Sequence, residues 1–348
     1  MGTTFTRRGF AGRSLTLAAG VALAAPFVRR AGAADPIRLR CSLDTAPSHV
    51  RNVSCADYLQ KLEAASNGAI KTEIFHGGSL FADRDVAKAL LQGQAEMAAP
   101  GSWVLAGFVP SCEMFHLPIM YAQPIEIAHK VIDGKPGQVL GAELQQKLRV
   151  HIIGNWIELG NHNWYSTKKP LNALTDLQGM KIRNSGGAAQ AWRTRFFGAI
   201  PNTTAWPDTP LALSQGTFDG LITTNESINS AQLWDAGLKY ALEDHQFIGE
   251  YIPMVSDAFW TKLPPDLQAL MGHVWADNIG AYRANMAASQ ERAKGVIQSH
   301  GVTYVIPSAD EIVAVRRRML GEQDAMAREV KIPPALVQAV MAEIGSTA

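Results

Sequence analysis

Two successive patterns of strand and helix limit the folds that this chain can adopt. Residues 36–43 alternate between apolar and polar side chains, which is the period of a half-buried strand. Helical spacing follows over residues 48–66, then a strand over 70–75, a helix over 83–93 and a short strand over 96–99. Strand, helix, strand, helix, strand is the order of an α/β unit with a parallel sheet.

The same order begins again near residue 150. Strands are expected over residues 150–155, 163–166, 180–183 and 218–223, and helices over residues 188–197 and 210–215. Two α/β units in one chain predict two lobes with a cleft between them. Ligands of such sheets bind at the carboxyl ends of the strands, so we expect a binding site there.

The C-terminal third is predicted to be mainly helical. Pro265 and Asp266 begin a run with helical spacing that ends at Gly301. About 35 residues at 1.5 Å each would span roughly 50 Å, which is enough to contact both lobes. Ser308 and Glu311 have the spacing of a capping box at the start of another helix. The predicted fold is α/β and two-lobed, with a ligand cleft between the lobes and a long C-terminal helix spanning both.

The first residues have the features of an export signal. Arg7 and Arg8 form a twin-arginine pair, and an apolar run follows over residues 14–28. Small residues near Ala33 suit a signal peptidase, so we expect residues 1–33 to be cleaved and the protein to be periplasmic. A retained membrane anchor is the alternative, but the run contains Pro26 and is shorter than the about 20 residues that a spanning helix needs.

The charge changes once this segment is removed. Five of the 32 basic residues precede Asp35 and none of the 31 acidic residues does, so the remainder has 27 basic and 31 acidic residues and a net charge near −4. This balance argues against a nucleic-acid partner, and we expect no membrane-embedded segment. Cys41, Cys55 and Cys112 are expected to be buried thiols, with a Cys41–Cys55 disulfide as the alternative.

Sequence motifs of the common enzyme classes are missing. The chain has no nucleophile elbow, H-E-x-x-H motif, P-loop or dinucleotide-binding glycine motif, and its nine histidines do not cluster at metal-ligand spacing. We therefore predict no catalytic residue, no metal and no cofactor. Arg183 follows a predicted strand and precedes Gly186 and Gly187, at the cleft. Its guanidinium could pair with a carboxylate, although a solvated surface arginine is the alternative.

Seven short segments occur in the order and spacing of one protein family. They are residues 78–85, 105–110, 115–118, 128–134, 176–183, 212–220 and 259–264. In this pattern the chain resembles the extracytoplasmic solute-binding proteins of TRAP (tripartite ATP-independent periplasmic) transporters, of the DctP type, over about residues 37–340. The resemblance implies a periplasmic binding protein fold, a small organic acid as ligand and TRAP membrane permease subunits as partners. We assign residues 34–160 and about 250–285 to lobe I, and residues 161–249 and about 286–348 to lobe II.

The resemblance also implies the residues of the site. In that family the arginine of a Lys-x-Arg strand end pairs with the ligand carboxylate, and Arg183 matches it. His162 stands where the family often has a second arginine. Thr223 takes the position of an asparagine that contacts the ligand, with Asn225 close by, and Trp206 keeps an aromatic residue of the family. Unless burial shifts its pKa from about 6.5, His162 would change charge in mildly acidic solution.

Tryptophans are expected to supply apolar walls. Trp103 and Trp156, like Trp206, occupy loop or strand-end positions at the predicted cleft, with packing in the core as the alternative. Leu221 and Ile222 replace a polar pair of the family, unless they point into the sheet core. Together these residues favour a monocarboxylate with an apolar or aromatic body over a sugar acid, whose buried hydroxyl groups would need many partners.

The predicted function is capture of a small organic acid by a monomeric periplasmic protein, which delivers it to the TRAP permease for ion-gradient-driven uptake. A secreted enzyme acting on a small acid is one alternative, and turnover of candidate acids would reveal it. A binding protein that feeds a sensor kinase is the other alternative, which the neighbouring genes would distinguish.

Overall fold

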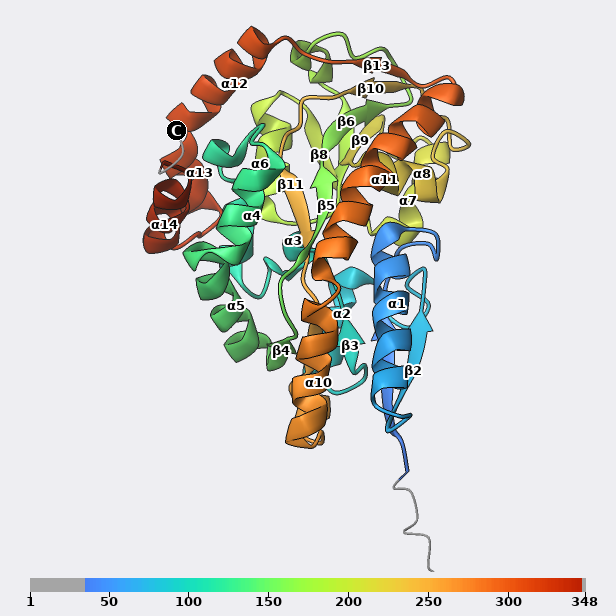
Figure 1. Ribbon diagram of the computed structural model, residues 1–348. Helices are drawn as coiled ribbons and strands as arrows, with labels where there is room; N and C mark the ends of the chain where they lie inside the picture. The colour runs from blue at the N-terminus through green and yellow to red at the C-terminus, as the bar shows by residue number, and fades with distance from the viewer. Residues whose placement is uncertain (1–34, 346–348) are drawn as a thin grey trace, which may run out of the picture. The chain divides into compact units, whose positions relative to one another are not determined.

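Two mixed β-sheets, joined by a pair of antiparallel strands, organise the chain (Figure 1). The structure is a computed structural model and describes residues 35–345. The elements below belong to the compact unit that begins at Pro36. The predicted signal peptide, with its twin-arginine pair, lies outside the described residues.

The strands are β1 (Ile37–Ser42), β2 (Ile70–Phe75), β3 (Met97–Ala98), β4 (Val150–Ile152), β5 (Ile157–Asn161), β6 (Asn163–Ser166), β7 (Lys181–Asn184), β8 (Ile200–Thr203), β9 (Gly220–Thr223), β10 (Tyr240–Leu242), β11 (Ile248–Tyr251), β12 (Met254–Ser256) and β13 (Thr303–Val305). The α-helices are α1 (Val50–Ala65), α2 (Asp83–Leu91), α3 (Ser102–Leu105), α4 (Ile125–Asp133), α5 (Lys135–Leu148), α6 (Ala188–Phe196), α7 (Thr209–Ser214), α8 (Asn225–Ala231), α9 (Asp257–Trp260), α10 (Pro265–Ala276), α11 (Ile279–Ser299), α12 (Ala309–Gly321), α13 (Gln323–Glu329) and α14 (Pro334–Gly345). The 3₁₀ helices are η1 (Pro110–His116), η2 (Pro118–Met120), η3 (Leu174–Leu177) and η4 (Trp206–Asp208).

The chain passes from one sheet to the other and back again. One sheet has the order β2-β1-β3-β12-β4, and the other has the order β13-β10-β6-β9-β7-β8. Strand β5 pairs antiparallel with β11. The segment β4–β5–β6 therefore runs from the first sheet to the second, and β10–β11–β12 returns. This crossing pair lies between the two α/β units, where a ligand cleft is expected.

Both predicted α/β units are confirmed. In β1, Leu39 and Cys41 are completely buried, as the alternating pattern predicts, and β1 pairs in parallel with β2 and β3. In the second unit, β7 pairs in parallel with β8 and β9, and α6 follows β7 after a Gly186-Gly187 turn. Apolar periodicity was sufficient for β1 because the strand alternates between buried and more exposed positions over most of its length.

The helical run predicted over residues 265–301 is two helices. Helix α10 ends at Ala276 and α11 begins at Ile279. At the break, the Asn278 side-chain amide donates a hydrogen bond of 2.7 Å to the Val274 carbonyl oxygen, which the interrupted helix would otherwise leave free. The longer helix, α11, packs against α1, α8 and β5, so it contacts elements of both units as predicted.

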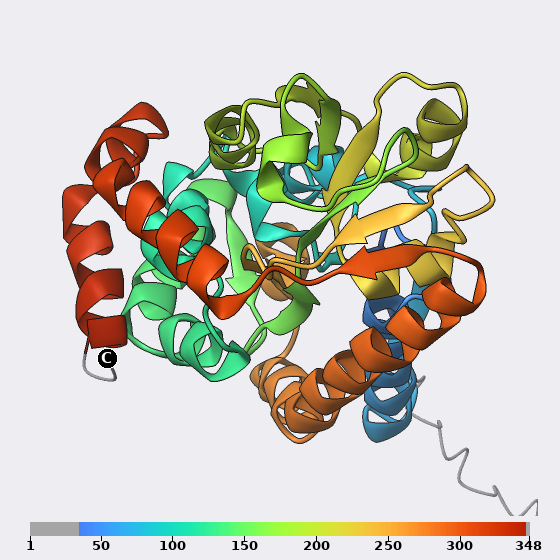
Figure 2. The same cartoon turned by 90° about the horizontal axis from the view of Figure 1, so that it is seen from above.

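The last three helices return to an earlier part of the chain. Helix α14 packs against α4 and α5, and α12 packs against η2. Figure 2 shows these helices, in red, beside the green helices α4 and α5. The predicted lobe boundaries stay a prediction. Under that assignment α14 lies in lobe II, whereas the helices that it contacts, α4 and α5, lie in lobe I.

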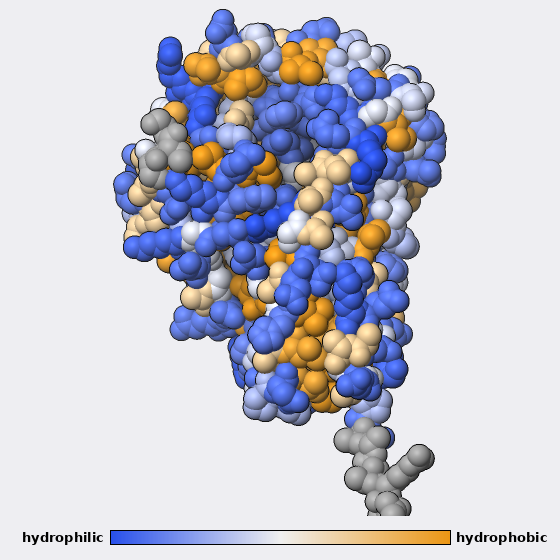
Figure 3. Space-filling view, viewed as in Figure 1, coloured by the Kyte–Doolittle hydropathy of each residue, from blue (hydrophilic) through white to orange (hydrophobic). Residues whose placement is uncertain are grey.

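The three cysteines are buried thiols. Cys41, Cys55 and Cys112 are free and buried, as expected, and no disulfide joins Cys41 to Cys55. Figure 3 shows apolar surface over α10, where Leu267 and Leu270 are only partly buried against the core. Within residues 35–345, no helix is both long enough and apolar enough to cross a membrane.

Candidate functional site

A cavity lies at the crossing strands, where chain segments from both sheets meet. It contains about 460 Å³ of space not filled by atoms, part of it open to solvent. Its lining residues are Asp44, Thr45, Asp83, Arg84, Trp103, Val104, Leu159, His162, Arg183, Ser185, Ala205, Trp206, Thr223, Ser227 and Tyr251. Arg183 and Thr223 lie at the carboxyl ends of β7 and β9, which is the position expected for a ligand site in an α/β fold.

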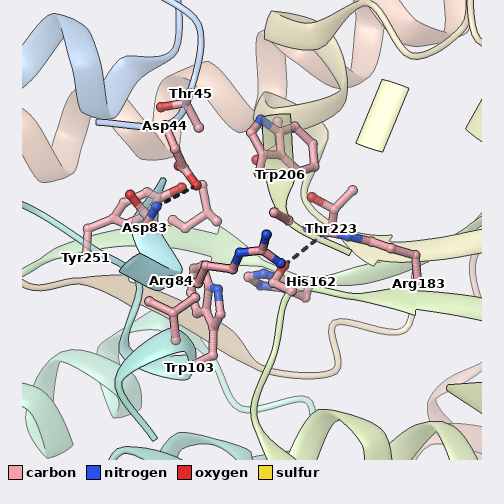
Figure 4. A pocket seen from close by; sticks show the side chains of 15 residues that line it. Asp44, Thr45, Asp83, Arg84, Trp103, His162, Arg183, Trp206, Thr223 and Tyr251 are labelled. Carbon is pink, nitrogen blue, oxygen red and sulfur yellow. Dashed lines mark hydrogen bonds between the residues drawn. The ribbon is translucent and has the colours of Figure 1, made fainter. Parts of the chain in front are cut away.

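Arg183 is completely buried, and the surrounding chain fixes its guanidinium (Figure 4). Nε and Nη2 donate to the Thr204 carbonyl oxygen at 2.9 and 2.8 Å, and Nη1 donates to Ser185 Oγ at 2.9 Å. A guanidinium has five N–H groups, so one N–H remains on each Nη atom. Burial lowers the pKa of Arg183 to about 10, which still leaves it charged at neutral pH. Arg183 can therefore offer two N–H groups to an anion.

Arg51 is equally buried but has a different environment. It donates five hydrogen bonds, to Asp44, to Asp83, to the Ala99 carbonyl oxygen and, through Nε and Nη2, to Thr45. Burial alone would lower the pKa of Arg51, but Asp83, Tyr251 and Asp44 raise it well above its usual value. Its N–H groups are all used, so Arg51 holds the cavity wall, whereas Arg183 has capacity left for a ligand.

His162 forms an aromatic part of the same wall. Its ring stacks on Phe247 with centroids 4.3 Å apart and meets Trp103 edge-on at 5.6 Å. A side chain on Gly249 would come within 2.5 Å of the His162 ring and 2.8 Å of Trp103, so glycine is required there. Burial lowers the pKa of His162 to about 3. The exception stated for the predicted charge change therefore applies, because burial keeps the ring neutral in mildly acidic solution.

The structure brings five of the seven predicted site residues to the cavity: Arg183, His162, Thr223, Trp206 and Trp103. Trp206 stands over Arg183, with 5.3 Å between the guanidinium carbon and the ring centroid. Thr223 is buried, and its hydroxyl has no hydrogen bond within residues 35–345, so it can serve a ligand. Trp103 closes another side, between His162 and Tyr251.

Asn225 and Trp156 do not reach this cavity. Helix α8 begins at Asn225 with Thr224 as its N-cap, so the change from strand to helix turns Asn225 away. Its Oδ1 accepts hydrogen bonds from the hydroxyls of Tyr165 and Tyr304, at 2.7 and 2.8 Å. Trp156 is buried with its ring 6.0 Å from Phe115 and faces a groove beside α5.

Leu221 and Ile222 also point into the sheet core. Both are completely buried, each in a different hydrophobic cluster, and neither lines the cavity. The alternation of β9 places them there, because its two faces are both covered. The part of the apolar-ligand prediction that rested on these two residues is therefore not supported.

Sequence reasoning missed several residues of the site. Asp44 follows β1, and Asp83 and Arg84 open α2, so the rule that ligands bind at the carboxyl ends of strands could have indicated them. Figure 4 shows Arg84 directed into the cavity between Trp103 and Trp206. Tyr251 comes from β11, and no local pattern in the sequence marks it.

Groups that could hold a metal ion were sought throughout the described chain. Across residues 35–345, no set of three or more His, Cys, Asp or Glu side chains is arranged to hold one. The cavity is lined by arginine, hydroxyl and aromatic side chains and by the carboxylates of Asp44 and Asp83, which are paired with Arg51. Arg183, with two N–H groups left over, gives this cavity a group that can bind an anion.

Comparison with known proteins agrees with this geometry. Residues 44–329 match the family model described as "Bacterial extracellular solute-binding protein, family 7" (DctP). The chain is 25% identical over 302 residues to the C4-dicarboxylate-binding periplasmic protein DctP of Rhodobacter capsulatus, covering 85% of this chain and 88% of that protein.

Solved structures are similar in fold. The sugar acid binding protein DctPAm of Advenella mimigardefordensis, in complex with galactonate, gives a TM-score of 0.84 at 20% identity and covers 90% of this chain and 99% of its own. A TRAP periplasmic solute binding protein of Ralstonia eutropha, with bound (S)-2-acetolactate, gives 0.82 at 20% identity and covers 89% and 99%. The fold is thus the predicted two-lobed α/β fold of periplasmic binding proteins.

Proposed function

This chain belongs to bacterial extracellular solute-binding protein family 7, and from that premise we propose that it captures a small organic acid in the cavity around Arg183. Members of the family are binding proteins and not enzymes. The acid would be delivered to the membrane permease subunits of a TRAP transporter for ion-gradient-driven uptake.

One observation carries this proposal: Arg183 is a buried cation without a carboxylate partner among the described residues. Its hydrogen bonds go to a carbonyl oxygen and a hydroxyl group, and two N–H groups remain. A buried charge is costly unless it is paired, so a carboxylate ligand would supply the missing partner. Two parallel N–H groups also match the two oxygens of a carboxylate.

The remaining lining indicates the rest of the ligand. Trp103 and Trp206 offer apolar faces on two sides of the cavity. The side chains of Arg84, Thr223 and Tyr251 donate no hydrogen bond within residues 35–345, and Arg84 has only a loose ion pair with Asp85, at 3.8 Å. A compact 2-oxo or 2-hydroxy acid with an apolar or aromatic body would use both kinds of surface. A sugar acid would place several hydroxyl groups against tryptophan.

The same proposal includes where and how the protein works. Residues 1–33 would direct export through the twin-arginine route, and the periplasmic protein would act as a monomer. The organic acid would favour the closed arrangement of the two lobes in proportion to its stronger contacts there. A binding protein that passes the acid to a sensor kinase remains the second candidate, and permease genes beside this gene would favour transport.

Ligand discovery tests the proposal directly. Native mass spectrometry of freshly purified protein should reveal a co-purified acid, and a thermal-shift panel should rank candidates, because a ligand that binds the folded state raises the melting temperature. The panel would contain phenylpyruvate, 2-oxoisovalerate, 2-acetolactate, succinate and galactonate. Arg183→Ala protein serves as the control and should show no shift with the best acid.

The outcomes separate two levels of the proposal. Stabilisation by phenylpyruvate or 2-oxoisovalerate would support the ligand class. Stabilisation by galactonate or succinate alone would overturn that class but keep carboxylate capture. An equal shift in wild-type and Arg183→Ala protein would contradict the role of Arg183.

A further inference from the structure

The turn that follows Arg183 is held by a side chain from a distant part of the sequence. Helix α6 begins at Ala188, and its N-cap residue, Gly187, provides no capping side chain. Glu113 of η1 takes that place, because its Oε1 accepts the Ala188 N–H at 2.6 Å. A carboxylate at a helix N-terminus satisfies a backbone donor that the helix cannot satisfy itself.

Glycine is required for this contact. Gly187 has φ +81°, a backbone conformation that L side chains rarely adopt. A Cβ atom at this position would lie 3.0 Å from both carboxylate oxygens of Glu113. Glu113 and the turn after Arg183 therefore fit together only because residue 187 has no side chain.

A chain of buried polar groups continues from Glu113 toward the ligand cavity. His116 Nδ1 lies 3.5 Å from Glu113 Oε2, and His116 Nε2 lies 3.3 Å from Gln190 Nε2. Gln190 Oε1 accepts the Ser185 N–H at 3.1 Å, and Ser185 Oγ accepts the Arg183 Nη1–H at 2.9 Å. With its proton on Nδ1, a neutral His116 can accept a hydrogen bond from Gln190 at Nε2. His116 Nδ1 and Glu113 Oε2 face each other without a hydrogen bond, so this first step of the chain is a close polar contact only.

A second bond ties the same two elements together. Arg193, also on α6, donates to the His116 carbonyl oxygen at 2.8 Å. His116, Gln190 and Arg193 are at most 1% exposed, so water does not compete for these bonds. Breaking one bond here would leave a buried polar group without a partner.

We propose that Glu113, His116 and Gln190 are positioning residues that hold Ser185 and thereby fix the Arg183 guanidinium for the ligand carboxylate. The inference rests on the proposed function for its consequence, which is carboxylate affinity. Glu113 and His116 come from η1, in the segment with the five-stranded sheet, whereas Arg183 and α6 belong to the six-stranded sheet. The orientation of the binding arginine therefore depends on packing between the two units.

The first measurement needs no ligand. NMR of protein with isotope-labelled arginine reports rotation about the two Cζ–Nη bonds of Arg183. The hydrogen bond to Ser185 should slow rotation about the Cζ–Nη1 bond. Gln190→Met removes the polar groups at similar volume. Gln190→Glu keeps an acceptor for the Ser185 N–H and, when protonated, a donor for His116. Gln298→Met, on the exposed side of α11, is the control.

Acetate, the smallest carboxylate used as a probe, then tests the consequence. We expect Gln190→Met to free the rotation of Arg183 Nη1 and to weaken acetate binding about fivefold, the effect of one hydrogen bond. The acetate affinities of the Gln190→Glu and Gln298→Met proteins should stay within about twofold of the wild-type affinity. If Gln190→Met does not fold, Ser185→Ala removes only the last link and should give the same NMR signature.

Two results would overturn the inference. One is wild-type rotation of Arg183 in the Gln190→Met or Ser185→Ala protein. The other is freed rotation with unchanged acetate affinity, which would make the chain structural only. If neither acetate nor any acid of the panel binds the wild-type protein, the proposed function is contradicted, whereas the rotation measurement still tests the inference because it does not depend on a ligand.

Discussion

Trp206 lies over the guanidinium of Arg183, with 5.3 Å between the ring centroid and the guanidinium carbon. Such a cation–π contact leaves the N–H groups at the edge of the guanidinium available for an anion. Trp206 therefore contributes twice, as an apolar wall of the cavity and as a support for the cation.

This relationship gives a first prediction. Trp206→Ala should weaken binding of the best panel acid by about 1–2 kcal/mol, and Trp206→Phe by less than about 1 kcal/mol, because a phenyl face keeps part of the interaction. Calorimetry with both variants checks it. Equal affinity of the Ala variant and wild type would place Trp206 outside the binding surface.

His162 gives a prediction about pH. Burial lowers its pKa to about 3, so it should stay neutral from pH 5 to pH 8. Affinity for the best acid should therefore show no step attributable to His162, and the His162→Gln variant should have a pH profile parallel to wild type. A step near pH 6 in the wild-type protein that disappears in the variant would contradict this prediction.

The sequence predicted a strand or a site residue correctly where a single physical rule was enough to place it. Alternation located β1, and the carboxyl-end rule pointed to Arg183, whereas Thr223 came from the family resemblance; both line one cavity. Asn225 was misplaced because the turn from β9 into α8 reverses its direction over two residues, and periodicity does not reveal this. Tyr251 was missed because only the pairing of β11 with β5 brings it near the site.

Periodicity also fails to reveal the break between α10 and α11. Apolar residues keep their helical spacing across the polar residues 277 and 278, from Val274 and Trp275 to Ile279, so the sequence pattern predicts one helix. Two bonds made by the Asn278 side chain favour a break there: a local one to the Val274 carbonyl oxygen and a tertiary one from Lys61 of α1. The tertiary bond from Lys61 has no signature in the local sequence.

Arg51 should be essential for stability. Replacing it by Met would leave the carboxylates of Asp44 and Asp83 buried without their cation, at a cost of about 3–5 kcal/mol in the free energy of unfolding. Arg38 pairs with Glu73 at the surface, and Arg38→Met should cost at most about 1 kcal/mol. Urea unfolding of both variants measures the difference, and similar losses would show that the Arg51 network is not stabilising.

Buried carboxyl groups predict how stability varies with pH. Burial raises the pKa of Glu113 and of Asp244 to about 7, well above their ordinary values. Between about pH 4.5 and 7 the folded protein keeps protons that the unfolded chain has lost, so the free energy of unfolding should fall as pH rises through this window. Each group should contribute roughly 1–3 kcal/mol.

Melting temperatures from pH 5 to pH 8 test this dependence. The melting temperature should decrease toward pH 8, and Glu113→Gln should flatten the decrease while it keeps an acceptor for Ala188. Glu126→Gln, at an exposed position of α4, is the matched control and should leave the slope unchanged. A melting temperature that rises toward pH 8 would contradict the expected sign.

Calorimetric binding of the best panel acid to wild-type, Arg183→Ala and Arg183→Lys protein tests the central claim most directly. Removing one partner of a buried charge pair should cost the Ala variant about 2–5 kcal/mol of binding free energy. The Lys variant should recover only part of this loss, since one ammonium cannot reproduce two parallel N–H groups. Arg195→Ala, which removes an exposed arginine of α6, should bind as wild type. Wild-type affinity in the Arg183→Ala protein would contradict the account.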